Sequence, residues 1–281
     1  MKKLIVTADD FGLTHSINEG ILMAAREGIV TNINLIPTGD AANDAIAVIK
    51  YDKIPEIGVH LALTETRPVT NTRLISSIVD DDGAFLKSRF KFLKKLFSGH
   101  IDIEHVKIEL KSQVDKAANS GARITNLSSH EHLHMIPEIF KILADLAKEY
   151  GIHYVRVLKQ EAIIPPFSLN KLFRSAVVGY FNPGMEKLLK KSGLAAADNF
   201  LGFLNSGAIR EDVLLRMLAD VKEGVTELVV HPGFLDPEVL NHYRFHINCE
   251  EELYALTGAR VKKIIANKGI KLSRYGDLGS V

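Results

Sequence analysis

The sequence predicts an α/β fold in which parallel strands form a closed or nearly closed barrel, with an open doubly wound sheet as the second choice. Short runs rich in β-branched residues alternate with longer segments of helical periodicity along the chain. Repeated strand–helix units of this kind produce a parallel sheet covered by helices. About seven such strands are predicted, which favours a barrel over the open sheet.

The predicted strands are short apolar runs that end at polar or turn-forming residues. The first, KLIVTA, has the character of a buried strand, and the second, TNINLI, alternates between polar and apolar residues. The last predicted strand is short. The predicted strands cover residues 3–8, 31–36, 57–63, 124–127, 153–158, 227–230 and 270–272.

The predicted helices show apolar residues at helical spacing. The first has Ile17, Ile21 and Ala24 on one face and Gly28 as its stop signal. The sixth is expected as two helices that break near Asn182–Pro183, because proline disrupts a helix interior. The helices are predicted at residues 16–28, 40–50, 90–97, 103–120, 137–150, 169–192, 209–223 and 250–268.

The chain is predicted to form a single domain over residues 1–281. It shows no internal repeat, no low-complexity segment and no linker. Residues 64–86 have the character of a loop, with Pro68 and a DDDG turn at 80–83. We therefore expect an elaborated loop and helical insertion around residues 64–100 within that one domain.

Composition excludes several classes of protein. The 35 basic and 34 acidic side chains give a formal net charge of +1, which argues against nucleic-acid binding. A single cysteine, Cys249, rules out an intrachain disulfide and a thiolate metal cluster. The apolar run after MKK is too short for a signal peptide, and no stretch of about 20 apolar residues predicts an integral membrane segment. The expected location is cytoplasmic.

The segment KSRFKFLKKLF at residues 87–97 is basic and amphipathic. Our first interpretation is a solvated helix face whose aromatic side chains pack inward. A membrane-surface or lid role is the alternative.

Histidines and carboxylates collect where the predicted strands end. In barrels and open parallel sheets alike, ligands bind at the carboxyl ends of the strands. Two aspartates follow the first strand, a histidine comes late in the third, a histidine cluster follows the fourth, an arginine lies in the fifth, and a histidine follows the penultimate strand. These residues are Asp9, Asp10, His60, His130, His132, His134, Arg156 and His231.

This set suits a divalent metal ion with an acid–base group beside it. Two adjacent carboxylates repel in a confined site, so one of them needs a cation or a proton. An aspartate with two or more histidines is a suitable ligand set for a metal that keeps open positions. We interpret the pair as one metal ligand and one residue that handles protons. A turn at Phe11–Gly12 would bring both to the rim.

Each motif also has a purely structural interpretation. Asp9–Asp10 is typical of helix caps and turns, and His60 could be a hydrogen-bonded core histidine. His231-Pro232-Gly233 could simply end a strand. The three clustered histidines at i, i+2 and i+4 are harder to explain structurally, since in an extended chain they share one face. The remaining histidines are expected to be structural or solvated: His15, His100, His105, His153, His242 and His246.

Four sequence blocks together resemble the YdjC-like carbohydrate deacetylases. The blocks are TADDFG at residues 7–12, GVHL at 58–61 followed by Leu63-Thr64, SHEHLH at 129–134 with Pro137, and HPG at 231–233. They occur in the same order from residue 3 to about residue 235. The family includes a chitooligosaccharide (diacetylchitobiose) deacetylase and a branch associated with hopanoid biosynthesis.

The resemblance implies a deformed (β/α) TIM-like barrel, related to NodB-type polysaccharide deacetylases, and a metal-dependent hydrolase that removes an N-acetyl group from a sugar. It implies one divalent ion, Mg²⁺ or Zn²⁺, held by an Asp-His-His set. By position, the set is Asp10, His60 and His130, with Asp9 as the general base and His231 as the general acid. The remaining site candidates would shape the pocket or orient ligands: His132, His134 and Arg156.

One position departs from the family pattern. Many members carry an aspartate directly before the Ser-His of the histidine cluster, where this chain has Ser128. The difference bears on substrate preference more than on metal binding.

Two other functions remain as alternatives: a non-catalytic carbohydrate or metabolite binder, and a metal-dependent phosphoesterase. The substrate stays open between a chitooligosaccharide, another N-acetylated sugar and a lipid-linked glycan. Residues 64–100 and 160–205 are expected to decide it. The resemblance also suggests a homodimer.

Overall fold

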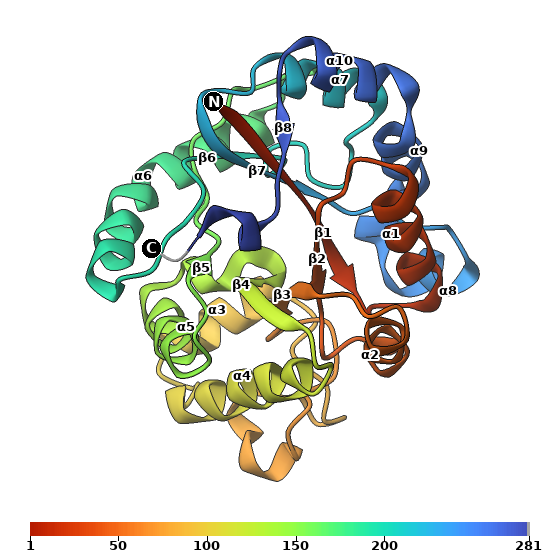
Figure 1. Ribbon diagram of the computed structural model, residues 1–281. Helices are drawn as coiled ribbons and strands as arrows, with labels where there is room; N and C mark the ends of the chain where they lie inside the picture. The colour runs from red at the N-terminus through yellow and green to blue at the C-terminus, as the bar shows by residue number, and fades with distance from the viewer. Residues whose placement is uncertain (280–281) are drawn as a thin grey trace.

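The computed structural model describes residues 1–279 as a curled parallel sheet surrounded by helices (Figure 1). Seven strands pair in the order β5–β4–β3–β2–β1–β7–β6, and β8 adds to β1 outside this path. All pairs are parallel. The strands are β1 (Lys2–Phe11), β2 (Asn32–Leu35), β3 (Glu56–Leu61), β4 (Arg123–Ser129), β5 (Tyr154–Val155), β6 (Asn199–Leu201), β7 (Gly224–Val230) and β8 (Lys271–Leu272).

The sheet curls until its two edges meet, which makes it a deformed barrel. Ala195, just before β6, accepts a hydrogen bond from Val155 N at 2.9 Å and donates one to His153 O at 2.9 Å. This isolated bridge joins β5 to the segment that precedes β6. The predicted α/β barrel is therefore confirmed, although only short backbone pairing closes it between β5 and the segment before β6.

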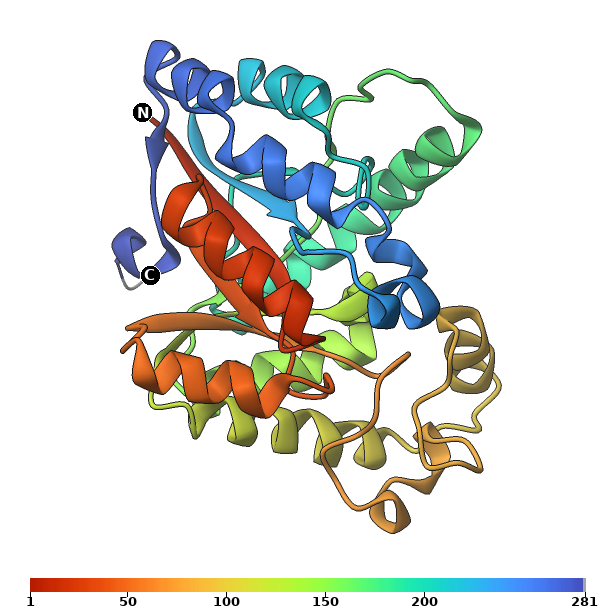
Figure 2. The ribbon, with the colours of Figure 1, turned by 90° about the vertical axis from the view of Figure 1, so that its right-hand side faces the viewer.

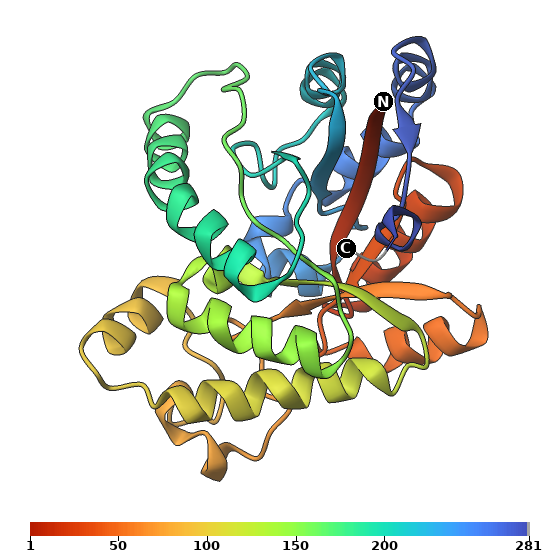
Figure 3. The same ribbon diagram turned by 60° about the vertical axis from the view of Figure 1, so that its left-hand side comes forward.

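Helices cover the outside of the sheet (Figure 2). In Figure 3, α4 and α5 pack side by side, and α6 contacts α5. The helices are α1 (His15–Glu27), α2 (Ala42–Tyr51), α3 (Arg89–Phe97), α4 (Ile103–Ala118), α5 (Pro137–Glu149), α6 (Leu169–Ser192), α7 (Glu211–Ala219), α8 (Pro237–His242), α9 (Cys249–Thr257) and α10 (Ala259–Asn267). None of the helices among residues 1–279 is both long and apolar enough to cross a bilayer.

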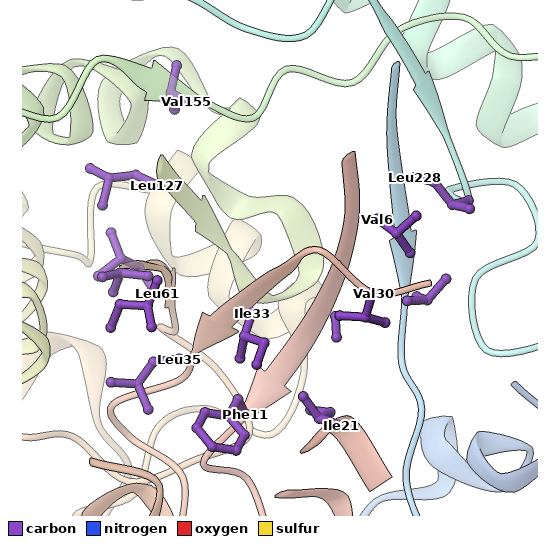
Figure 4. Close-up of a cluster of buried hydrophobic side chains, with 14 of the residues drawn as sticks. Val6, Phe11, Ile21, Val30, Ile33, Leu35, Leu61, Leu127, Val155 and Leu228 are labelled. Atoms are coloured by element: carbon purple, nitrogen blue, oxygen red, sulfur yellow. The ribbon is translucent and has the colours of Figure 1, made fainter. Parts of the chain in front are cut away.

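The main hydrophobic core lies between the sheet and the helices. Alternate residues of β1 point outward into it, among them Val6, which lies in the same cluster as Ile21 of α1 (Figure 4). Helix α1 begins at a defined point because the Thr14 hydroxyl accepts a hydrogen bond from Ile17 N at 3.2 Å. Since these outward-pointing side chains fill the core between sheet and helices, the side chains on the opposite face of each strand point into the barrel interior.

The barrel interior is polar. Asn34 Nδ2 donates to Asp9 Oδ1 at 2.8 Å, and Asn126 Nδ2 donates to Asn34 Oδ1 at 3.0 Å. Gly58 lies between these two amides, where a Cβ atom would come within 1.8 Å of Asn34 Oδ1. The position therefore needs glycine, and the amides form a hydrogen-bonded column that leads up to Asp9 and the carboxyl ends of the strands.

Several predicted boundaries were wrong. Helix α6 continues through Pro183 as one helix instead of breaking there. The predicted helix at 250–268 is two helices, because Gly258 adopts an extended conformation (φ −62°, ψ 138°) between α9 and α10. Strand β5 is only two residues long, and β6 and α8 were not predicted. Elements of two to six residues carry too little periodicity to be read from sequence.

The insertion after β3 consists of two 3₁₀ turns, Thr72–Leu74 and Ser76–Ile78, followed by α3. The buried carboxylate of Glu109 in α4 accepts hydrogen bonds from Val69 N at 3.0 Å and Thr70 N at 2.9 Å. The loop is therefore tied to the body of the protein at its base, next to the strand that carries His60.

Candidate active site

Asp9 and Asp10 lie at the end of β1 on either side of the His60 ring. His60 Nδ1 is 3.6 Å from Asp9 Oδ1, and His60 Nε2 is 3.6 Å from Asp10 Oδ1. The two aspartates both reach the rim because the β1–β2 register shifts between Ala8 and Phe11, and Asp10 has a positive φ of 68°. The predicted turn at Phe11–Gly12 is present, since Leu13 N donates to Asp10 O at 3.0 Å, and the left-handed conformation of Asp10 adds backbone strain of a kind common at functional sites.

Asp10, His60 and His130 form a group that could hold a metal ion. One ligand atom from each lies within 4.8 Å of the other two. His130 Nδ1 is 3.3 Å from Asp10 Oδ1. Within residues 1–279, neither buried carboxylate oxygen of Asp10 receives a hydrogen bond. A buried carboxylate without donors is costly unless a cation neutralises it, so these residues fit a divalent ion.

Ser128 orients the imidazole of His60. The Ser128 hydroxyl lies 2.8 Å from His60 Nδ1, accepts a hydrogen bond from Asn34 Nδ2 at 3.0 Å and donates to Val59 O at 3.4 Å. These partners fit the tautomer in which Nδ1–H donates to Ser128 and the lone pair of Nε2 faces Asp10. Burial lowers the pKa of His60 to about 4, so the ring is neutral near pH 7. The hydroxyl of Ser128 therefore orients and supports His60.

His130 is held between two carboxylates. Its Nδ1 faces Asp10 and its Nε2 is 3.0 Å from Glu65 Oε2. Burial alone would lower the pKa of His130, but the negative charges of Asp10 and Glu65 and the hydrogen bond to Glu65 raise it well above its usual value. A divalent ion must replace that proton in order to bind, since only neutral imidazole is a ligand.

Asp9 is paired with a buried arginine instead of with the metal group. Arg156 Nη1 donates to Asp9 Oδ2 at 2.6 Å and Nη2 donates to Asp9 Oδ1 at 2.9 Å, while Nε and Nη2 also donate to Glu227. Burial would raise the pKa of Asp9, but Arg156 and His60 lower it to about 2. Asp9 is therefore ionised near neutral pH and fixed in orientation.

The three clustered histidines do not share a face. They lie in a 3₁₀ segment, His130–Met135, in which Glu131 (φ 52°) and His132 (φ 56°) have left-handed conformations. His134 turns away from the rim, with Nδ1 2.7 Å from Ser129 Oγ and Nε2 2.9 Å from Arg156 O. His132 packs edge-on against the ring of Phe203. The chain is not extended here, so the three rings do not share a face, and only His130 of the three reaches Asp10.

His231 follows β7 and is fixed by its backbone. Its N–H donates to Glu252 Oε2 at 2.7 Å. The chain after it passes very close to α1, because a Cβ on Gly20 would lie 2.4 Å from Gly233 Cα. Burial lowers the pKa of His231 to about 4, although Asp10 and Asp9 partly oppose this shift. Its ring lines the same pocket as Asp9 and Asp10 and is neutral near pH 7.

Two residues of the site were missed from the sequence. His246, expected to be structural or solvated, is 2% exposed, and its Nε2 is 3.2 Å from Asp10 Oδ2. Glu65 contacts His130 from the loop after β3. Both come from segments beyond the strand ends that fold back over the rim, so no spacing in the sequence marks them. The expectation for His15 holds, since it is exposed and pairs with Asp44.

The metal group lies in a pocket of about 340 Å³. Its floor carries the aspartates and histidines described above. Its walls come from α3, the start of α6, and the segment from α8 to His246, and they carry three arginines, Arg89, Arg174 and Arg244. The pocket is large enough and polar enough to take a small polar substrate next to the metal group.

The carboxyl group of Glu252 makes the stability of this site depend on pH. Burial raises the pKa of Glu252 from 4.5 to about 7, although it accepts hydrogen bonds from His231 N and Ile209 N. Between pH 4.5 and about 7, the folded state holds a proton that the unfolded state has lost. The free energy of unfolding should therefore fall as pH rises through this window, by about 3 kcal/mol in total.

Urea unfolding of the wild type and of Glu252→Gln at several pH values tests this expectation. The difference between the two stabilities should change with pH only in that window, since the variant cannot titrate there. A pH-independent difference would show that Glu252 keeps an ordinary pKa.

Comparisons with known proteins find relatives that match almost the whole chain. A protein-family model described as YdjC-like protein matches residues 3–267. A protein of Thermoanaerobacter pseudethanolicus named carbohydrate deacetylase is 27% identical over 278 residues, which cover 99% of this chain and all of the relative. A Mus musculus protein with the same name is 28% identical, with 99% of this chain and 95% of the relative covered.

One solved structure is similar over its whole length. It is a protein of Enterococcus faecalis V583 for which cleavage of cellobiose phosphate has been proposed. The TM-score is 0.79 and the identity is 26%, and the alignment covers 99% of each chain.

Proposed function

The chain belongs to the YdjC-like protein family, and from this premise we propose that it is a metal-dependent hydrolase that removes the N-acetyl group from an acetylated sugar. Relatives aligned over almost the entire chain bear the name carbohydrate deacetylase. The observation that supports the proposal most strongly is the division of roles between two adjacent aspartates. Asp10 joins the group that could hold a metal, and Asp9 is kept off it by Arg156.

The proposed ligands are Asp10, His60 and His130. A divalent ion there would supply positive charge that polarises the acyl carbonyl and makes water a stronger acid. Two imidazoles and one carboxylate favour Zn²⁺, while Mg²⁺ would need water to complete an oxygen-rich shell. We propose one of these two ions.

Asp9 is proposed as the general base. It is ionised and aligned by Arg156, and it lines the pocket next to the metal group. It would take a proton from the water that attacks the acetyl carbon, so that a C–O bond forms. The C–N bond then breaks, and acetate and a free amine are the products.

His231 is proposed as the group that protonates the departing nitrogen. Its ring is neutral near pH 7, so it must receive a proton within the reaction cycle before it can donate one. Its side chain lines the pocket that also contains Asp9 and Asp10, where a bound substrate would lie. His132, His134 and Arg156 act on shape and orientation in this scheme.

Acetate release tests the proposal. The wild type, loaded with Zn²⁺ or Mg²⁺, should release acetate from at least one member of a panel of N-acetylated sugars. His130→Ala should lose both bound metal and activity, because one of three ligands is gone. The exposed His153 offers a matched control, and His153→Ala should keep both.

Results other than acetate release would support a different function. Phosphate release from sugar phosphates without acetate release would favour a phosphoesterase. Sugar binding without any product would favour a non-catalytic binder. Normal metal content in His130→Ala would show that the ligand set is wrong.

A further inference from the structure

Helix α6 exposes a continuous apolar stripe to solvent. Its exposed side chains recur at the spacing of a single helix face and include Phe173 at 69% and Tyr180 at 81% exposure. An amphipathic helix normally buries its apolar face, so this face lacks a partner within the described chain. The stripe, together with Phe167 two residues before the helix, consists of Phe167, Leu169, Leu172, Phe173, Val177, Tyr180 and Phe181.

Helix α3 has the same character, which corrects the expectation that its aromatic side chains pack inward. Only Phe92 is buried, whereas Phe90 is 69% and Phe97 is 75% exposed. Between residues 83 and 101 the chain has no acidic residue, and between 162 and 185 it has none either. The basic residues of these two segments are Lys87, Arg89, Lys91, Lys94, Lys95, Lys171 and Arg174.

Both helices border the mouth of the active-site pocket. Arg89, the first residue of α3, and Arg174 of α6 line the pocket wall. In Figure 2, the ochre α3 and the green N-terminal end of α6 stand on the side of the molecule toward which β1 and β7 point. The two helices that carry the exposed apolar and basic side chains therefore border the entrance to the site.

We propose that α3 and the N-terminal half of α6 dock the protein onto an anionic lipid bilayer, with the pocket mouth facing the membrane. Exposed aromatic side chains that enter the interface, flanked by lysines that attract anionic headgroups, are the features that such surfaces share. The basic excess is local, because the whole chain has 35 basic and 34 acidic side chains.

A second copy of the chain fits this surface less well. A two-fold dimer would place the same patch against itself, so basic side chains would face basic side chains, although Arg89 lies 3.9 Å from Glu131. An anionic surface neutralises the same charges and covers the same apolar side chains. The charge pattern therefore favours lipid over self-association at this face.

Vesicle sedimentation tests the proposal without any turnover. The wild type should bind vesicles made of equal parts phosphatidylcholine and phosphatidylglycerol, and should bind pure phosphatidylcholine much more weakly. Lys91→Glu/Lys94→Glu should weaken binding at least about tenfold, because each lysine near an anionic surface contributes roughly fivefold. Phe173→Ser/Tyr180→Ser should weaken it by a similar factor.

Matched controls lie away from the mouth. Tyr51, at the far end of α2, is 88% exposed, so Tyr51→Ser makes the same kind of change on another face. Lys222→Glu/Lys263→Glu repeats the charge change at exposed lysines elsewhere. Both controls should bind vesicles like the wild type, and both should hydrolyse a water-soluble substrate normally.

Three results would overturn the docking surface: no binding of the wild type to the anionic vesicles, equal loss in the control variants, or a wild-type dimer that Phe173→Ser/Tyr180→Ser converts to a monomer. The last would assign the face to a second copy. Vesicle binding without acetate release would refute the proposed function and leave the docking surface intact.

Discussion

Asp9→Asn is expected to reduce the rate of acetate release by about 10²- to 10⁴-fold, the usual contribution of a general base. Asparagine has nearly the same shape but cannot accept the proton. Bound metal should remain near the wild-type level, because Asp9 is held by Arg156 and lies outside the Asp10, His60 and His130 group. Turnover numbers and metal content of the purified variant, measured together, check both parts.

A matched substitution separates this effect from a general loss of charge. Asp44 pairs with His15 on the surface, where its side chain is 61% exposed, so Asp44→Asn should leave turnover unchanged. Full activity in Asp9→Asn would refute the assignment of the base. Simultaneous loss of metal would instead place Asp9 among the ligands.

Arg156→Met is expected to lower the free energy of unfolding by about 3–5 kcal/mol, because it leaves buried carboxylates without their counter-charge. Arg156 is completely buried between Asp9 and Glu227. Methionine fills much of the same volume but has no charge and no donors. Chemical denaturation of the variant and the wild type at pH 7 measures the difference.

Two further variants make this prediction specific. Combining Arg156→Met with Asp9→Asn and Glu227→Gln removes the unpaired charges and should recover most of the lost stability. Arg123→Met breaks an ion pair with Glu56 in which the arginine side chain is 63% exposed, so it should cost less than about 1 kcal/mol. A small effect of Arg156→Met alone would show that the buried carboxylates take up protons without penalty.

The barrel and the residues at its strand ends were predictable because both follow from periodicity. Parallel strands place their carboxyl ends together, so the sequence alone groups Asp9, Asp10, His60, His130 and His231, which line one pocket. The alternation in TNINLI also carried information, since its asparagines belong to the polar barrel interior.

The rest depends on backbone conformations that sequence patterns do not encode. Because Glu131 and His132 adopt left-handed conformations, His130 is the only one of the three clustered histidines that reaches Asp10. Loop closure brings Glu65 and His246 to the same place from segments with no motif. The role of Arg156 was also hidden, because its importance comes from being buried between two carboxylates on distant strands.

The most direct measurement is an anomalous-scattering map from crystals grown with Zn²⁺. We predict a single peak bonded to Asp10, His60 and His130, with the Asp9 carboxylate still paired to Arg156 and outside bonding distance of the ion. An empty rim in the map, or an ion bound through Asp9, would contradict the division of roles between the two aspartates.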